Sequence, residues 1–291
     1  MEKMEQGLVT DGGKRDDEFF VIRHSLAQYQ GNKAIIGSDN PEAAFDPKTQ
    51  DFRSDLTPDG QELARTEAEK FFDQLDPERD AIFFASSDLV RAIETAQIYK
   101  DVAKERGFEI IVPENVRNEI VEEIGEGEIR KVEALSLNIE NMLLDFVFFP
   151  EDQLEEAVKD KDFVSEDTKR RWVEARKIIE SDNQGTWGRN YHKHSRAIQE
   201  IFPNIRTAEN MYDKKFKGMV RLMRMAQRKI NQEQPQKNIK VLAFSHENAM
   251  LHFMSQNFHD ASINNCEGVA FKIDGPNIKA TARGQTKDIN I

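Results

Sequence analysis

Apolar residues along this chain fall into short continuous runs separated by stretches of helical periodicity. A run of this kind, a strand's length long and bounded by polar residues, is typical of a strand buried on both faces of a sheet. Helical patterns fill most of the intervals, and such alternation predicts an α/β fold: a three-layer α/β/α sandwich with a largely parallel central sheet. The predicted strands are residues 18–23, 81–85, 108–112, 238–245 and 268–273.

Two of the predicted helices have clear start or stop signals. Thr57 is a good N-cap, and Pro58 is the residue type favoured at the first helical position. This helix is predicted to run from residue 58 to about residue 75. A second helix is predicted over residues 89–106, because Gly107 supplies the glycine that often follows a helix end.

The alternation breaks between about residues 130 and 202, where an apolar run at 143–149 and a highly charged helical stretch replace it. We interpret this region as a helical insertion in a single domain that spans residues 18–291. Residues 1–17 are polar and lack periodicity, so they are predicted to form a flexible N-terminal tail.

Composition narrows the possible functions. With 53 acidic and 41 basic residues, the formal net charge is -12, which argues against a nucleic-acid partner. No apolar segment reaches the roughly 18 residues that a membrane helix needs, and the first residues lack the apolar core of a signal peptide. We therefore expect a cytoplasmic protein without a membrane partner. Cys266 is the single cysteine, so no internal disulfide can form.

Basic side chains follow three of the predicted strands. Arg23 and His24 end the first strand, Arg91 lies in the first turn of the helix after the second, and His246 follows the fourth. The carboxyl ends of parallel strands share one edge of a sheet, where ligands bind. Guanidinium groups bind phosphate oxygens, and a neutral imidazole can attack phosphorus. These residues therefore predict phosphoryl transfer without a metal or another cofactor.

Four separated blocks resemble motifs of the histidine phosphatase superfamily, also called phosphoglycerate mutase-like. Residues 21–24 resemble its opening Arg-His-Gly block, and residues 56–60 its Leu-Thr-x-x-Gly helix start. Residues 87–96 resemble its Ser-x-Leu-x-Arg-Ala-x-x-Thr-Ala signature, and residues 244–246 its closing histidine block. The blocks occur in the family's order and leave residues 130–202 unmatched. Ser25 departs from the family, which usually has glycine there.

The resemblance implies a mechanism. His24 would attack phosphorus and become a phosphohistidine, while Arg23, Arg91 and His246 hold the phosphoryl oxygens. The substrate would be a small phosphorylated molecule. The family also uses a polar side chain soon after the nucleophile to contact substrate, which implies a substrate-binding role for Ser25 and for Gln30, with Gln28 as an alternative to Gln30.

The family also needs a carboxylic acid that protonates the leaving oxygen. Residues 121–127 fit its Leu-x-Glu-x-x-x-Gly pattern if Glu123 is that acid, with Glu119 and Glu122 as near alternatives. Another branch places the acid directly after the second histidine, where this chain has Glu247.

The function expected first is a phosphatase that hydrolyses a phosphomonoester. The alternative is phosphoglycerate mutase-type transfer, in which the phosphohistidine returns its phosphoryl group to a bound intermediate. A second alternative is a non-catalytic interaction protein that binds a partner through its charged insertion. No metal site is expected: His192 and His194 lie two residues apart on a predicted helix, so they point to different faces.

Overall fold

The computed structural model of the chain describes residues 16–27, 45–46, 51–52, 56–87, 89–111, 123–124, 129–131, 165–181, 187–203, 207–211, 218, 224, 236–274 and 277–289. The predicted tail up to residue 15, the apolar run at 143–149 and Gln28 and Gln30 lie outside these residues. Within the described part, no helix combines the length and the apolar character needed to cross a bilayer.

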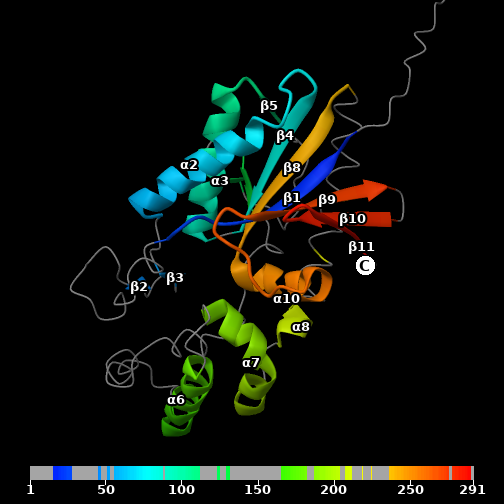
Figure 1. The fold of residues 1–291 in the computed structure, drawn as a ribbon. Coiled ribbons are helices and arrows are strands. Elements are labelled where there is room, and N and C mark those ends of the chain that lie inside the picture. The colour runs from blue at the N-terminus through cyan, green and yellow to red at the C-terminus, as the bar shows by residue number, and fades with distance from the viewer. Residues whose placement is uncertain are drawn as a thin grey trace, which may run out of the picture.

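In the described part of the chain, a nine-stranded mixed sheet forms the centre of the fold (Figure 1). Its strand order is β11-β10-β9-β1-β8-β4-β7-β6, and β5 pairs with β4 next to β7. Strands β1, β8, β4, β5 and β7 run parallel, whereas β9, β10, β11 and β6 add antiparallel edges. The bounds are β1 Glu18–Arg23, β4 Asp80–Ser86, β5 Glu109–Ile110, β6 Glu123–Ile124, β7 Ile129–Lys131, β8 Asn238–Ser245, β9 Gly268–Asp274, β10 Asn277–Ala282 and β11 Gln285–Ile289.

Helices cover both faces of this sheet, which confirms the predicted α/β class. Helices α2 (Pro58–Phe72) and α3 (Val90–Glu105) pack on one face, and α10 (Glu247–Phe258) packs on the other. The Thr57 side chain accepts a hydrogen bond from the amide of Gly60, so the predicted N-cap is confirmed. A separate small hairpin joins β2 (Phe45–Asp46) to β3 (Asp51–Phe52).

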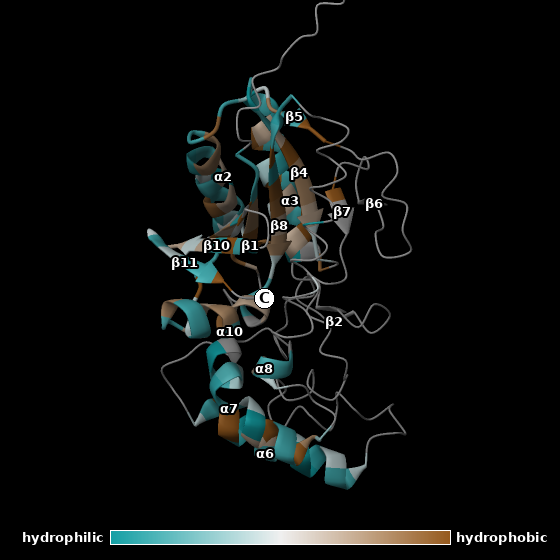
Figure 2. Cartoon of the chain, turned by 90° about the vertical axis from the view of Figure 1, so that its right-hand side faces the viewer, coloured by the Kyte–Doolittle hydropathy of each residue, from teal (hydrophilic) through white to brown (hydrophobic). Residues whose placement is uncertain are grey.

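The core lies in two layers, one on each side of the sheet. Along β8, Val241 packs into the cluster beneath α10, while Leu242 packs into the cluster beneath α2 and α3. Because successive side chains point to opposite faces, a strand buried on both sides must be apolar throughout. Figure 2 shows the central strands β4 and β8 largely in the brown of hydrophobic residues.

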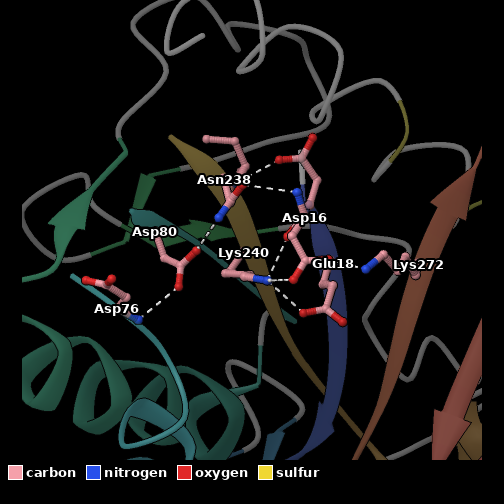
Figure 3. Close-up of polar contacts among 9 residues, drawn as sticks. Asp16, Glu18, Asp76, Asp80, Asn238, Lys240 and Lys272 are labelled. Atoms are coloured by element: carbon pink, nitrogen blue, oxygen red, sulfur yellow. Dashed lines mark hydrogen bonds and ion pairs between the residues drawn. The ribbon is translucent and has the colours of Figure 1, made fainter. Parts of the chain in front are cut away.

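Lys240 is the exception in this buried strand, and Figure 3 shows how it is accommodated. Its side chain is 3% exposed, and its ammonium group donates to Glu18 Oε2 and to the carbonyl of Asp16, each at 2.7 Å. A hydrogen bond from Lys272 lowers the pKa of the Asp16 carboxyl. The Asp17 carboxylate accepts a hydrogen bond from the amide of Ile239 at 2.7 Å. These contacts fix the chain just before β1, within the last residues of the predicted tail.

Described parts of the insertion are helical. Helices α6 (Glu166–Glu180) and α7 (Trp187–Ile201) pack on each other, and the short α8 (Ala208–Met211) follows. The α7 helix also packs on α10, where the rings of His192 and His252 lie 5.6 Å apart. Figure 1 shows α7 beyond α10, at the end of the sheet where β8 finishes. The described helices of the insertion thus lie beyond α10, at the end of the sheet where β8 finishes.

Candidate active site

Neighbouring parallel strands bring the predicted basic residues together. Strand β8 lies between β1 and β4, with Arg23 level with Ser245 and Ser86 level with Phe244. The next residues along each chain segment therefore meet at one edge of the sheet. The rings of His24 and His246 lie 5.1 Å apart at 58° to each other. The structure places both histidines, buried, at the predicted edge.

Two hydrogen bonds define the state of the His24 imidazole. Nδ1 lies 2.6 Å from the carbonyl oxygen of Ser25, which can only accept, so Nδ1 carries the proton. Nε2 then has the lone pair of the ring, which accepts a hydrogen bond from Nε of Arg91 at 3.2 Å. Burial and the Arg91 charge hold the pKa of His24 well below its ordinary value, against the Ser25 contact. His24 is therefore a neutral imidazole whose unprotonated nitrogen faces a guanidinium.

His246 is held by Ser87, which was not among the predicted site residues. The Ser87 hydroxyl lies 2.7 Å from Nε2 of His246, and the Ser87 amide donates to the Phe244 carbonyl at 3.0 Å. Ser87 is the first residue of the block at 87–96 that resembles the family signature, so the sequence did contain a pattern that marks it. It fixes the second imidazole beside the first.

Arg23 is a buried cation with few partners. Its Nη1 donates to the carbonyl of Ile263 at 2.6 Å, and its Nη2 lies 3.4 Å from Oε2 of Glu247. Its Nε has no hydrogen-bond partner among the described residues. Buried guanidinium nitrogens are normally satisfied, because an unpaired buried donor costs free energy. Arg23 can therefore satisfy a further acceptor, as an oxyanion would.

The four candidate acids are placed differently. The Glu247 side chain is 10% exposed and lies between Arg23 Nη2, at 3.4 Å, and Arg189 Nε, at 3.9 Å. The backbone of Glu123 lies in β6, which pairs with β7 at the sheet edge beyond β4. Glu119 and Glu122 fall outside the described residues.

Arg189 was not predicted as a site residue. It lies on α7, within the insertion, and it reaches the site only because α7 packs on α10. No local pattern in the sequence could have identified it.

Ser25 directly follows His24, the predicted nucleophile, in the loop of residues 24–27 after β1, which we call the nucleophile loop. Its hydroxyl donates to the carbonyl of Gly60 at 2.6 Å, and its amide donates to the Thr95 hydroxyl at 3.0 Å. The side chain is fully buried, and these contacts join the nucleophile loop to α2 and α3. The small hydroxymethyl group therefore fits where the family usually has glycine.

A Cβ on Gly60 would lie 2.0 Å from the carbonyl oxygen of Leu26. Only glycine allows this approach between α2 and the nucleophile loop.

The charge of the site opposes the charge of the whole chain. Three arginines surround the site: Arg91 contacts His24, and Arg23 and Arg189 lie near the Glu247 carboxylate. The site therefore has an excess of basic side chains, although the formal net charge of the chain is -12. In the described part of the chain, no group of three or more His, Cys, Asp or Glu side chains is placed to hold a metal ion. The arrangement can bind a small anion and can offer it a neutral imidazole nucleophile.

No model of a known protein family matches the sequence, and no curated protein matches it. Solved structures to which this chain is similar include a phosphoglycerate mutase from Bacillus anthracis, with 12% identity, coverage of 94% of this chain and 92% of that one, and a TM-score of 0.43. The ecdysone phosphate phosphatase of Bombix mori, solved with tungstate, has 12% identity, coverage of 94% and 95%, and a TM-score of 0.43. The alpha-ribazole phosphatase of Shigella flexneri has 17% identity, coverage of 91% and 94%, and a TM-score of 0.36. With identities of 12% to 17% and TM-scores below 0.5, these likenesses leave the chemistry of this chain to its own residues.

Proposed function

We propose that this protein is a phosphatase that hydrolyses a small phosphomonoester through a phosphohistidine on His24. The observation that carries the proposal is the pair of hydrogen bonds made by the His24 imidazole, which fixes its tautomer. Its proton lies on Nδ1, tied to the Ser25 carbonyl, and its Nε2 lone pair lies beside the Arg91 guanidinium. A phosphoryl group bound by Arg91 would replace this hydrogen bond, since its oxygens accept from the guanidinium, and would present its phosphorus to the lone pair.

The first chemical step forms the phosphoenzyme. The phosphoryl oxygens bind the guanidinium groups of Arg23 and Arg91, and His246 contributes a further contact from its fixed position beside Ser87. Nε2 of His24 attacks phosphorus as the bond to the ester oxygen breaks. The ring then carries a positive charge, which the Ser25 carbonyl stabilises at Nδ1. The leaving oxygen takes a proton from a carboxylic acid.

The second step returns the enzyme to its starting state. Water attacks phosphorus, the same carboxylate takes the water proton, and the bond between phosphorus and Nε2 breaks. The electron pair of the broken bond returns to Nε2 of the ring, and inorganic phosphate leaves the site. No step in this cycle requires a metal ion.

We propose Glu123 as the acid, from the fit of residues 121–127 to the family pattern. Glu247 is the competing candidate, because it lies at the site. Its ion pairs with Arg23 and Arg189 suit a carboxylate that holds these cations in place. Glu123→Gln should therefore slow hydrolysis most for substrates with poor leaving groups, whereas Glu247→Gln should weaken phosphate binding for good and poor leaving groups alike.

Hydrolysis of p-nitrophenyl phosphate with a chelator present tests the proposal. We expect release of p-nitrophenol by the natural protein, and its loss in His24→Ala and in His246→Ala. His194→Ala is the matched control, because this histidine lies on α7 and its Nε2 has no hydrogen-bond partner among the described residues. Full activity in His24→Ala would contradict the mechanism. Phosphoenzyme formation from a bisphosphorylated donor without net phosphate release would instead identify a mutase, and no phosphoenzyme from any donor would favour a binding protein.

A further inference from the structure

The segment between α10 and β9 holds the backbone on which the proposed chemistry depends. We define residues 262–267 as the clamp segment. The Arg23 amide donates to the Glu267 carbonyl, and the Cys266 amide donates to the Arg23 carbonyl, each at 3.0 Å. The Arg23 guanidinium donates to the Ile263 carbonyl at 2.6 Å. The clamp segment therefore fixes both the backbone and the side chain of Arg23.

His24 is held by the same segment. The side-chain amide of Asn265 donates to the His24 carbonyl at 3.2 Å. The next residue, Cys266, has a φ of 59°, in the left-handed region that non-glycine residues rarely occupy. The clamp segment thus has an irregular backbone, which needs support from outside to keep its shape.

Arg283 supplies this support with a single guanidinium. Its Nε and Nη2 form a two-pronged contact with the Glu267 carboxylate, at 2.5 and 2.9 Å. Nη2 also lies 3.2 Å from both the carbonyl and the hydroxyl oxygen of Ser262, and Nη1 pairs with Asp260. The guanidinium therefore ties the first and the last residue of the clamp segment together.

Glu267 transmits this contact into the segment. Its Oε2 also accepts a hydrogen bond from the amide of Asn264 at 2.7 Å, and its own amide donates to the Asn264 carbonyl at 3.1 Å. Its carbonyl is the acceptor for the Arg23 amide. A continuous chain of contacts therefore runs from Arg283 through Glu267 to Arg23.

The backbone conformation at Arg283 is one that arginine rarely adopts, so the turn alone does not explain why arginine occupies this position. Arg283 and Gly284 form the two-residue turn between β10 and β11, with φ values of 50° and 72°. Asparagine and glycine are preferred at such positions, and an arginine with positive φ costs free energy. A residue that suits the turn poorly is thus placed where its guanidinium reaches the clamp segment.

We propose that Arg283 is a positioning residue for the phosphoryl-transfer site, which sets the places of Arg23 and His24 through the clamp segment. This inference rests on the proposed function of those two residues. Arg283 touches neither of them, so its effect passes through Glu267, Asn265 and Ile263. Its removal should disturb the chemical step more than the fold.

The test variant is Arg283→Asn, since asparagine accepts the left-handed backbone while removing every guanidinium contact. With p-nitrophenyl phosphate, we expect kcat/KM to fall on the order of tenfold to 100-fold, as misplaced catalytic groups do. The loss should lie mainly in the rate of phosphohistidine formation, and Arg283→Lys should recover part of it. Lys287→Asn is the matched control, since it removes one exposed positive charge from β11 in the same hairpin.

A second readout is the imidazole nitrogen spectrum of His24, assigned by its loss in His24→Ala. Arg283→Asn should shift the Nδ1 signal, and Lys287→Asn should leave it in place. An unchanged spectrum with unchanged kinetics would overturn the inference, as would an activity loss that equals the loss of folded protein. If the natural protein forms no phosphoenzyme on His24, the proposed function fails, and the spectrum still decides whether Arg283 positions His24.

Discussion

Gly60→Ala should change the free energy of unfolding in two opposite ways, through a gain in helix propensity and through a steric clash with the backbone of Leu26. Alanine favours a helix over glycine by up to about 1 kcal/mol, and Gly60 lies in the first turn of α2. The added Cβ, however, would lie 2.0 Å from the Leu26 carbonyl oxygen and 3.1 Å from the Thr57 hydroxyl oxygen. The nearest atom belongs to the backbone, so no side-chain rotation can relieve the contact. Either α2 or the nucleophile loop must move.

The movement breaks specific hydrogen bonds. The Thr57 amide donates to the Leu26 carbonyl at 3.1 Å, and the Ser25 hydroxyl donates to the Gly60 carbonyl at 2.6 Å. Two such bonds contribute about 1 kcal/mol each, and overpacking adds about 1–3 kcal/mol. After the helix gain is subtracted, we expect Gly60→Ala to lower the free energy of unfolding by on the order of 3 kcal/mol. Turnover should also fall, because Leu26 closely follows His24.

Urea denaturation measures this change directly, with Gly218→Ala as the matched control. Among the described residues, a Cβ on Gly218 would meet no atom within 4 Å, so that variant should be neutral or slightly stabilising. Equal stability of Gly60→Ala and the natural protein would refute the claim that α2 and the nucleophile loop are in backbone contact at Gly60.

Three further predictions concern the nucleophile and its neighbours. Because burial holds the pKa of His24 well below 6.5, the unfolded chain takes up a proton below pH 6.5 that the folded chain does not. The contribution of this group should therefore lower the free energy of unfolding as the pH falls below about 6.5, the ordinary pKa of histidine, and His24→Asn should remove that decrease in urea titrations. Ser25→Gly should lower the free energy of unfolding by about 1–2 kcal/mol, since a buried hydrogen bond is lost. The KM should stay unchanged, and a raised KM would instead support the substrate contact predicted for Ser25. Arg91→Lys should lower kcat by roughly 100-fold, because lysine cannot reproduce the guanidinium fork beside Nε2 of His24. Single-turnover kinetics would measure the phosphorylation step, and an unchanged rate of that step would contradict this role of Arg91.

The sheet centre and the basic site residues could be predicted for one physical reason. Strand β8 is buried on both faces, so its sequence is an almost unbroken apolar run, and its end is marked by Ser245 and His246. Parallel strands bring such ends together, so Arg23, His24 and His246 could be assigned to one site before their geometry was known.

The remaining parts depend on contacts that leave no local pattern. Two of the three buried residues of strand β10, Ala280 and Ala282, are small, and the turn after it has arginine before Gly284 in place of the usual Asn-Gly. The hairpin therefore lacks both a strong strand signal and a turn signal. Arg189 reaches the site through helix packing alone, which the sequence of α7 does not specify.

The most direct test of the central claim is to locate the phosphoryl group on the enzyme. The natural protein would be mixed briefly with a labelled phosphomonoester, quenched in alkali, and digested for mass spectrometry. We expect one acid-labile phosphoryl group, on Nε2 of His24, that forms and disappears at rates matching turnover and is absent from His24→Ala. A label on any other residue, or undiminished turnover in His24→Ala, would contradict the account.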